Sequence, residues 1–177
     1  FCTPAKGPPD TFWAMSHPIG LIGLGLMGKP MALNLRKKGF DVIVHNRSRA
    51  AVEALVAQGA TAAGSPAEVA RAGRVVITML PDGRDVEKVL DGANGVFGAM
   101  QKGSVIVDSS TIAPAIARRL PARATELGGS MLDAPVSGGE IGAIAGTLTF
   151  MVGGDAAALE DVRPMLTAMG SPEKIVH

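Results

Sequence analysis

Short apolar runs alternate with segments of helical periodicity along most of this chain. The short, mostly apolar runs predict strands at 19–22, 40–45, 74–80, 104–108, 131–133 and 148–152. Segments whose apolar residues recur at helical spacing predict helices at 29–36, 52–58, 66–70, 85–90, 113–127 and 156–169. This alternation predicts an α/β fold, a doubly wound and mostly parallel sheet with helices on both faces. Residues 174–177 are expected to add a last edge strand.

The first residues of the chain depart from this pattern. Residues 1–10 contain three prolines and no apolar period. We therefore interpret residues 1–14 as a tag or an upstream extension, and residues 15–177 as one domain. The alternative is that Phe12 and Trp13 dock on the protein surface or on a neighbouring molecule.

A glycine-rich turn joins the first predicted strand to the first predicted helix. It consists of Gly23, Leu24, Gly25, Leu26, Met27 and Gly28. Glycines at this spacing permit a tight turn, a close approach of the backbone to a pyrophosphate and close packing of helix on strand, and the helix N-terminus offers free N–H groups to the anion. The turn therefore predicts a Rossmann-type NAD(P)-binding domain over residues 15–177, the alternative being a tight turn without a ligand.

The tip of the second predicted strand carries Asn46, Arg47 and Ser48, with Arg49 next in the chain. An acidic residue here would bind the adenosine ribose hydroxyls of NAD, whereas a 2′-phosphate favours positive charge and neutral donors. We therefore expect NADP(H) to be the preferred cofactor, with NAD(H) as the alternative. A solvated loop with no ligand is the competing interpretation.

The loops after the strands predicted at 74–80 and 104–108 supply further cofactor candidates. The turn formed by Met79, Leu80 and Pro81 is expected to lie against the ribose next to the nicotinamide, and Thr111 to meet that ribose or the carboxamide. Val86 is assigned to the same pocket. Alternatively, Ser110 or Thr111 only caps the following helix. We interpret Asp108, at the end of the strand predicted at 104–108, as structural.

A serine followed by two glycines, at Ser137, Gly138 and Gly139, is the candidate substrate site. A hydroxyl group and successive backbone N–H groups can bind a small carboxylate without a cationic side chain. The alternative is a flexible turn.

Three segments together resemble the β-hydroxyacid dehydrogenase family, which includes 3-hydroxyisobutyrate dehydrogenases, tartronate semialdehyde reductases and glyoxylate or succinic semialdehyde reductases. They are Ile-Gly-Leu-Gly-Leu-Met-Gly-Lys-Pro-Met-Ala at 22–32, Thr-Met-Leu-Pro at 78–81 and Asp-Ala-Pro-Val-Ser-Gly-Gly at 133–139. Segments 108–111 and 146–154 look closest to the tartronate semialdehyde reductase branch, while the tip of the second strand departs from the acidic version of that branch.

The resemblance implies an oxidoreductase that interconverts a small β-hydroxyacid and its semialdehyde. In this family a lysine on a long helix just after the cofactor domain protonates the substrate oxygen, and an all-helical C-terminal domain closes the pocket and forms the oligomer. The chain ends at His177, so we expect it to lack the catalytic lysine and the helical domain, and to be inactive alone. Lys174 does not take that role, because residues 171–176 look like a loop entering an edge strand.

Composition excludes several other functions. A formal net charge of +1 argues against a nucleic-acid partner, and no apolar stretch approaches the roughly 20 residues that span a bilayer. Cys2 is the only cysteine and the three histidines are scattered, so we expect neither a disulfide nor a metal site, and we expect a cytoplasmic protein. The expected partner is a small carboxylate or semialdehyde, with a homo-oligomer for the longer parent and self-association for the fragment. The alternative is a non-catalytic nucleotide- or partner-binding module of dehydrogenase ancestry.

Overall fold

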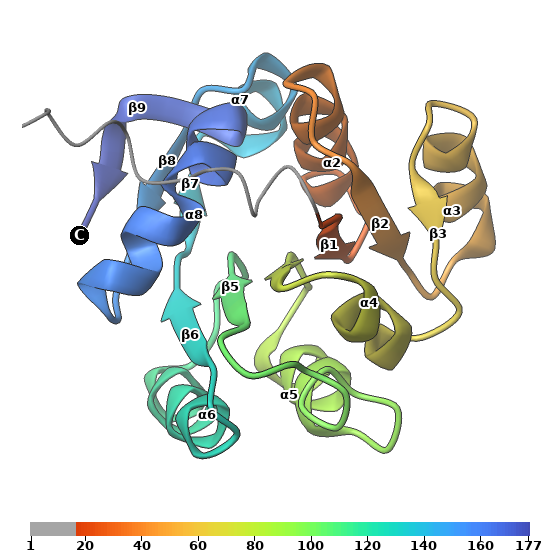
Figure 1. The fold of residues 1–177 in the computed structure, drawn as a ribbon. Helices are drawn as coiled ribbons and strands as arrows, with labels where there is room; N and C mark the ends of the chain where they lie inside the picture. The colour runs from red at the N-terminus through yellow and green to blue at the C-terminus, as the bar shows by residue number, and fades with distance from the viewer. Residues whose placement is uncertain (1–16) are drawn as a thin grey trace, which may run out of the picture.

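A computed structural model describes residues 17–177, where helices and strands alternate around a central sheet (Figure 1). The sheet has six strands, in the order β3 (Thr61–Ala62), β2 (Val42–His45), β1 (Ile19–Ile22), β4 (Val75–Thr78), β5 (Val105–Asp108) and β6 (Ser130–Asp133). All five pairings between neighbouring strands are parallel. The chain moves outward from β1 in one direction and then from β4 in the other, which is the Rossmann arrangement and places a crevice at the carboxyl ends of these strands. The predicted fold class is confirmed.

Helices cover both faces of this sheet. One face is covered by α2 (Gly28–Lys37), α3 (Arg49–Val56) and α8 (Ala156–Met169), and the other by α4 (Pro66–Ala72), α5 (Gly83–Asp91) and α6 (Pro114–Glu126). The strands are buried on both sides, because alternate side chains enter the two hydrophobic cores: Val75 and Ile77 one of them, Val76 the other. This is why β1, β4 and β5 are apolar runs rather than alternating ones.

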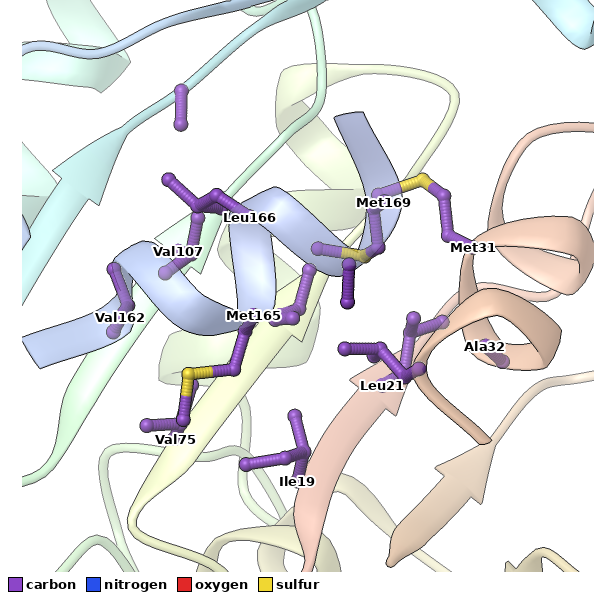
Figure 2. Close-up of a cluster of buried hydrophobic side chains, with 14 of the residues drawn as sticks. Ile19, Leu21, Met31, Ala32, Val75, Val107, Val162, Met165, Leu166 and Met169 are labelled. Carbon is purple, nitrogen blue, oxygen red and sulfur yellow. The ribbon is translucent and has the colours of Figure 1, made fainter. Parts of the chain in front are cut away.

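Methionines fill much of the core beneath α8. Figure 2 shows Met165 pointing toward Val75 of β4, and Met31 of α2 extending toward Met169. All three methionines are completely buried. An unbranched thioether side chain fills irregular gaps, which suits the place where a helix meets both a sheet and a second helix.

Residues 133–177 contain a second, smaller sheet that the sequence pattern did not predict. Its strands are β7 (Val136–Ser137), β8 (Leu148–Met151) and β9 (Gly170–Val176), and α7 (Gly139–Ala145) lies between β7 and β8. The expected edge strand at 174–177 is confirmed in part: β9 covers residues 174–176 and lies at the edge of a sheet, but it starts at Gly170 and pairs in parallel with β8 instead of extending the main sheet. The fully buried side chains of Leu148 and Phe150 anchor this small sheet on α8.

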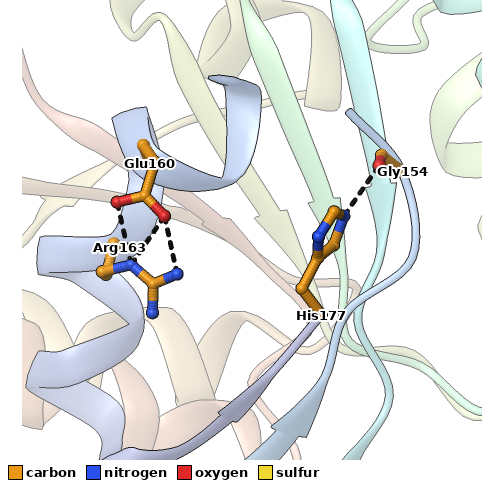
Figure 3. Close-up of polar contacts among 4 residues, drawn as sticks. All are labelled: Gly154, Glu160, Arg163 and His177. Carbon is orange, nitrogen blue, oxygen red and sulfur yellow. Dashed lines mark hydrogen bonds and ion pairs between the residues drawn. The ribbon is translucent and has the colours of Figure 1, made fainter. Parts of the chain in front are cut away.

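Polar contacts secure the end of this region (Figure 3). The carboxylate of Glu160 and the guanidinium of Arg163 form an ion pair at 2.7 Å on the exposed side of α8. A ring nitrogen of His177 lies 3.0 Å from the carbonyl oxygen of Gly154, which ties the residue after β9 to the loop before α8. The interpretation of residues 1–14 lies outside the described residues.

Candidate cofactor site

The carboxyl ends of β1, β2, β4 and β5 bring four of the predicted loops to one edge of the sheet. Ile22 is paired with His45 on one side and with Thr78 on the other, and Thr78 is paired with Asp108. The loops that follow these paired residues hold every predicted cofactor residue except Val86. Ligands of open parallel sheets bind at this edge.

Two of the three glycines in the first loop are required by the chain itself. Gly23 has a φ of +98°, and a Cβ atom there would overlap the carbonyl oxygen of Met79. A Cβ atom on Gly28 would overlap the carbonyl oxygen of Gly23. Gly25 is different, because a Cβ atom there would meet nothing within 4 Å. The chain leaves open space above Gly25, as a close backbone approach to a ligand requires.

The same loop offers backbone donors that the described chain does not use. The Leu24 amide donates to Oδ1 of Asn46 at 3.0 Å, but the amides of Gly25, Leu26 and Met27 make no hydrogen bond to any residue in 17–177. Met27 is the N-cap of α2 and supplies no side-chain cap. In contrast, Ser65 caps α4, Asp82 caps α5 and Asp155 caps α8. Free N–H groups at a helix N-terminus attract an anion, and the open space at Gly25 lets a phosphate reach them.

The tip of β2 holds one anchored residue, Asn46, followed by three exposed ones. The side-chain amide of Asn46 accepts from Leu24 and donates to the Ser48 carbonyl oxygen at 3.2 Å, so it ties the glycine turn to this tip. Arg47 and Ser48 are exposed. Arg49 is engaged with Glu53 at 3.1 Å. Arg49 is exposed as well, but only the side chains of Arg47 and Ser48 are both exposed and without a hydrogen bond or ion pair within residues 17–177.

The loops after β4 and β5 are joined by buried polar side chains. Oδ1 of Asp108 accepts from the Thr78 hydroxyl at 2.8 Å and from the Ser110 amide at 3.1 Å. The Leu80 amide donates to the Ser110 hydroxyl oxygen at 2.9 Å. Burial raises the pKa of Asp108, although the hydrogen bonds from Ser110 and Thr78 oppose the shift.

The capping alternative for Ser110 and Thr111 is wrong. The helix α6 begins at Pro114, its N-cap is Ala113, and no side chain caps it. Ser110 instead holds the Leu80 amide, while Thr111 is exposed at the edge of the site. The network of Thr78, Asp108 and Ser110 was missed in the sequence because its partners are about 30 residues apart.

Val86 is the one predicted cofactor residue that lies away from this edge. Its side chain is fully buried in α5, in the core that also contains Leu90, Val96 and Leu120. The helical spacing of Val86 and Leu90 reflects the packing of α5 on the sheet. In this structure Val86 presents no surface to a ligand.

The predicted substrate residues lie just before and at the start of α7, the helix that faces the glycine turn across a groove. Ser137 is exposed on β7, and Gly138 and Gly139 lead into α7 with φ values of +127° and +59°. The open groove, of about 570 Å³, is lined by the glycine turn and α2 on one side and by Glu140 and Ile144 of α7 on the other. The predicted loop at this place is thus partly helical.

A buried asparagine fixes α7 against α2. Nδ2 of Asn34 donates to the Ala143 carbonyl oxygen at 2.7 Å, in the last turn of α7. The sequence analysis did not single out Asn34, although a polar residue between the buried positions Met31 and Leu35 was a usable signal. This hydrogen bond sets the distance between the cofactor helix and the segment that carries Ser137.

Comparison with known proteins identifies the family. Residues 18–177 match the family described as the NAD binding domain of 6-phosphogluconate dehydrogenase. The chain belongs to this family. An NAD(P)-binding domain is also what the open glycine turn indicates, and no helix within residues 17–177 has the length and apolar character needed to cross a membrane.

Two curated relatives of this NAD(P)-binding domain are dehydrogenases or reductases. The NAD-dependent L-serine dehydrogenase of Pseudomonas aeruginosa is 51% identical over 86% of this chain and 51% of the relative. The 2-hydroxy-3-oxopropionate reductase of Escherichia coli is 46% identical over 86% of this chain and 52% of the relative. The chain therefore spans about half the length of the curated relatives it matches.

Solved structures show the same fold. A 3-hydroxyisobutyrate dehydrogenase from Mycobacterium tuberculosis, solved with L-serine, matches with a TM-score of 0.81 at 40% identity. The match covers 87% of this chain and 52% of the solved chain. Psf3 in complex with NADP+ and 2-OPP matches with a TM-score of 0.83 at 35% identity. This match covers 86% of this chain and 54% of the Psf3 chain. The resemblance to the β-hydroxyacid dehydrogenases is confirmed.

Proposed function

We propose that this chain is the cofactor domain of an NADP-dependent oxidoreductase that interconverts a small β-hydroxyacid and its semialdehyde. The observation that carries the proposal is the uncapped start of α2, where three backbone amides have no partner in the described chain beside open space at Gly25. The amides of Gly25, Leu26 and Met27 are a ready site for the pyrophosphate. The relatives named above support the reaction class.

The other loops hold the remaining parts of the cofactor and the substrate. Met79, Leu80 and Pro81, with Thr111, flank the ribose next to the nicotinamide, which supplies or accepts the hydride when the cofactor is bound. The Ser137 hydroxyl and the amides of Gly138 and Gly139 bind the substrate carboxylate. Separate loops of the chain thus orient the two reactants relative to each other.

The preference for NADP rests on the tip of β2. Arg47 and Ser48 are exposed there, and segment 46–49 contains no acidic residue that would repel a 2′-phosphate. A guanidinium group can bind a phosphate through two parallel hydrogen bonds, whereas NAD offers it only hydroxyl groups. One relative is named as NAD-dependent and one structural neighbour holds NADP+, so the decision falls to these side chains.

Calorimetric titration with NADPH and with NADH tests the proposal. We expect the unaltered chain to bind NADPH more tightly, and Arg47→Ala to weaken NADPH binding by about tenfold while leaving NADH binding within about twofold. Arg49→Ala is the matched control, because Arg49 is already paired with Glu53 and its loss should change neither affinity much. Tighter binding of NADH contradicts the NADP assignment, and binding of neither cofactor contradicts the proposed role of the chain.

Exposed apolar side chains support the expectation of self-association. Leu26, Ile141 and Ile144 are 72%, 84% and 58% exposed, and they belong to the glycine turn and to α7. Apolar side chains grouped around a groove favour association. Light scattering should show a mass that rises with concentration, and a monomer at every concentration would contradict the expectation.

A further inference from the structure

The polar network at the ends of β4 and β5 has no chemical task in the proposed reaction. Its side chains, those of Thr78, Asp108 and Ser110, are completely buried. One oxygen atom, Oδ1 of Asp108, accepts hydrogen bonds that originate on both strands. Because the Ser110 hydroxyl in turn accepts from the Leu80 amide, the network connects the Leu80–Pro81 turn to the segment that ends in Thr111.

Only one of the two oxygen atoms of the Asp108 carboxyl group has a partner within residues 17–177. Oδ2 of Asp108 and the hydroxyl of the neighbouring Ser109 are buried and make no hydrogen bond within residues 17–177. Burying a polar atom without a partner costs free energy. An apolar side chain at this position would remove the unpaired Oδ2, but it would leave the buried Thr78 hydroxyl and Ser110 amide without their acceptor. The burial of Oδ2 without a partner is therefore the feature that stability does not explain.

We propose that Asp108 is a positioning residue for the nicotinamide half of the cofactor. It acts through Thr78 and Ser110 to hold Leu80, Pro81 and Thr111 at a fixed separation. This inference rests on the proposed cofactor role of the chain. The adenosine half is assigned to other groups, the glycine turn and the tip of β2, which are joined by the separate hydrogen bond between Leu24 and Asn46. Loss of Asp108 should therefore weaken contact with one half of the cofactor and spare the other.

Two probes separate these halves. NADPH contains the nicotinamide ribonucleoside, whereas 2′-phospho-ADP-ribose carries the same adenosine, 2′-phosphate and pyrophosphate without the nicotinamide. We expect Asp108→Ala to weaken NADPH binding by about tenfold and to change 2′-phospho-ADP-ribose binding by less than about twofold. Asp108→Asn keeps an oxygen acceptor for Thr78 and Ser110, so it should restore most of the NADPH affinity.

Thr78→Val provides a second, nearly isosteric variant if Asp108→Ala fails to fold. It removes the hydroxyl donor to Asp108, and we expect the same split between the two probes with a smaller loss. Equal losses of affinity for both probes in a folded variant, or no loss for either, would overturn the positioning role. If the unaltered chain binds neither probe, the proposed function fails, and this inference fails with it.

Discussion

The two halves of the candidate cofactor edge are built in opposite ways. At the glycine turn the polar groups belong to the backbone, they face open space, and the amides of Gly25, Leu26 and Met27 have no partner in the described chain. At the ends of β4 and β5 the polar groups are side chains, they are fully buried, and they bind one another. The backbone amides of the first half need a ligand to complete their hydrogen bonding, whereas most polar groups of the second half find their partners within the chain.

This difference separates effects on binding from effects on folding. A change in the open half should alter cofactor affinity without altering stability, unless it touches a backbone contact within the turn. A change in the closed half should alter both, because the same hydrogen bonds hold the fold and place the loops. The glycine turn contains one position that faces open space, Gly25, and one that contacts the backbone, Gly28. Substitutions at these two positions therefore test the difference within a single turn.

Gly28→Ala should have the largest effect, because it breaks the fold of the open half. The new Cβ atom would overlap the Gly23 carbonyl oxygen, which β1 and the turn hold in place. Overpacking of this kind costs about 3 kcal/mol, and the higher helix propensity of alanine returns about 1 kcal/mol. We expect denaturant titration to show a net loss of about 2 kcal/mol in the free energy of unfolding. Unchanged stability would show that the turn can relax around a methyl group.

Gly25→Ala is the matched control in the same turn and should have a smaller effect of a different kind. A Cβ atom at Gly25 meets nothing, so the free energy of unfolding should change by less than about 0.5 kcal/mol. NADPH affinity should fall by about tenfold, equivalent to about 1.4 kcal/mol, because the methyl group occupies the space above the turn. A stable variant that binds NADPH normally would contradict the assignment of this space to the pyrophosphate.

The sequence predicted the parts of the molecule that depend on local pattern. The strands of the main sheet, apart from the two-residue β3, are short apolar runs, and the glycine turn has a spacing that the backbone requires at Gly23 and Gly28. The helix α7 was missed because Gly139–Ala145 is short and contains two glycines, so its local helical signal is weak. Its place is set by the distant Asn34.

Side-chain roles were harder to predict than backbone roles, for a related reason. Val86 lies a few residues after the Leu80–Pro81 turn, but its side chain is buried in the hydrophobic core where α5 packs on the sheet. The Asp108 network was missed because the ends of β4 and β5 and the loops that follow them must first come together in space. Asn46 was placed correctly at the tip of β2, but its amide is bound to the chain itself.

Asp108→Asn should have the smallest effect. It tests whether the buried second half of the edge disfavours a charge on Asp108. Burial raises the pKa of Asp108, hydrogen bonds from Ser110 and Thr78 oppose that shift, and the nearby charge of Asp133 adds to it. The folded state therefore holds the Asp108 proton more tightly than the unfolded state. The resulting contribution to stability is fully present below the ordinary aspartate pKa of about 4 and is lost as the pH rises through the raised value.

Asparagine cannot ionise, so the variant should gain stability relative to the unaltered chain as the pH rises from about 4 toward neutrality. Denaturant titrations of both proteins across this range measure the difference. If the stability of the variant instead falls relative to the unaltered chain as the pH rises, the folded state favours the ionised form of Asp108. The buried network at the ends of β4 and β5 would then accommodate a charged carboxylate.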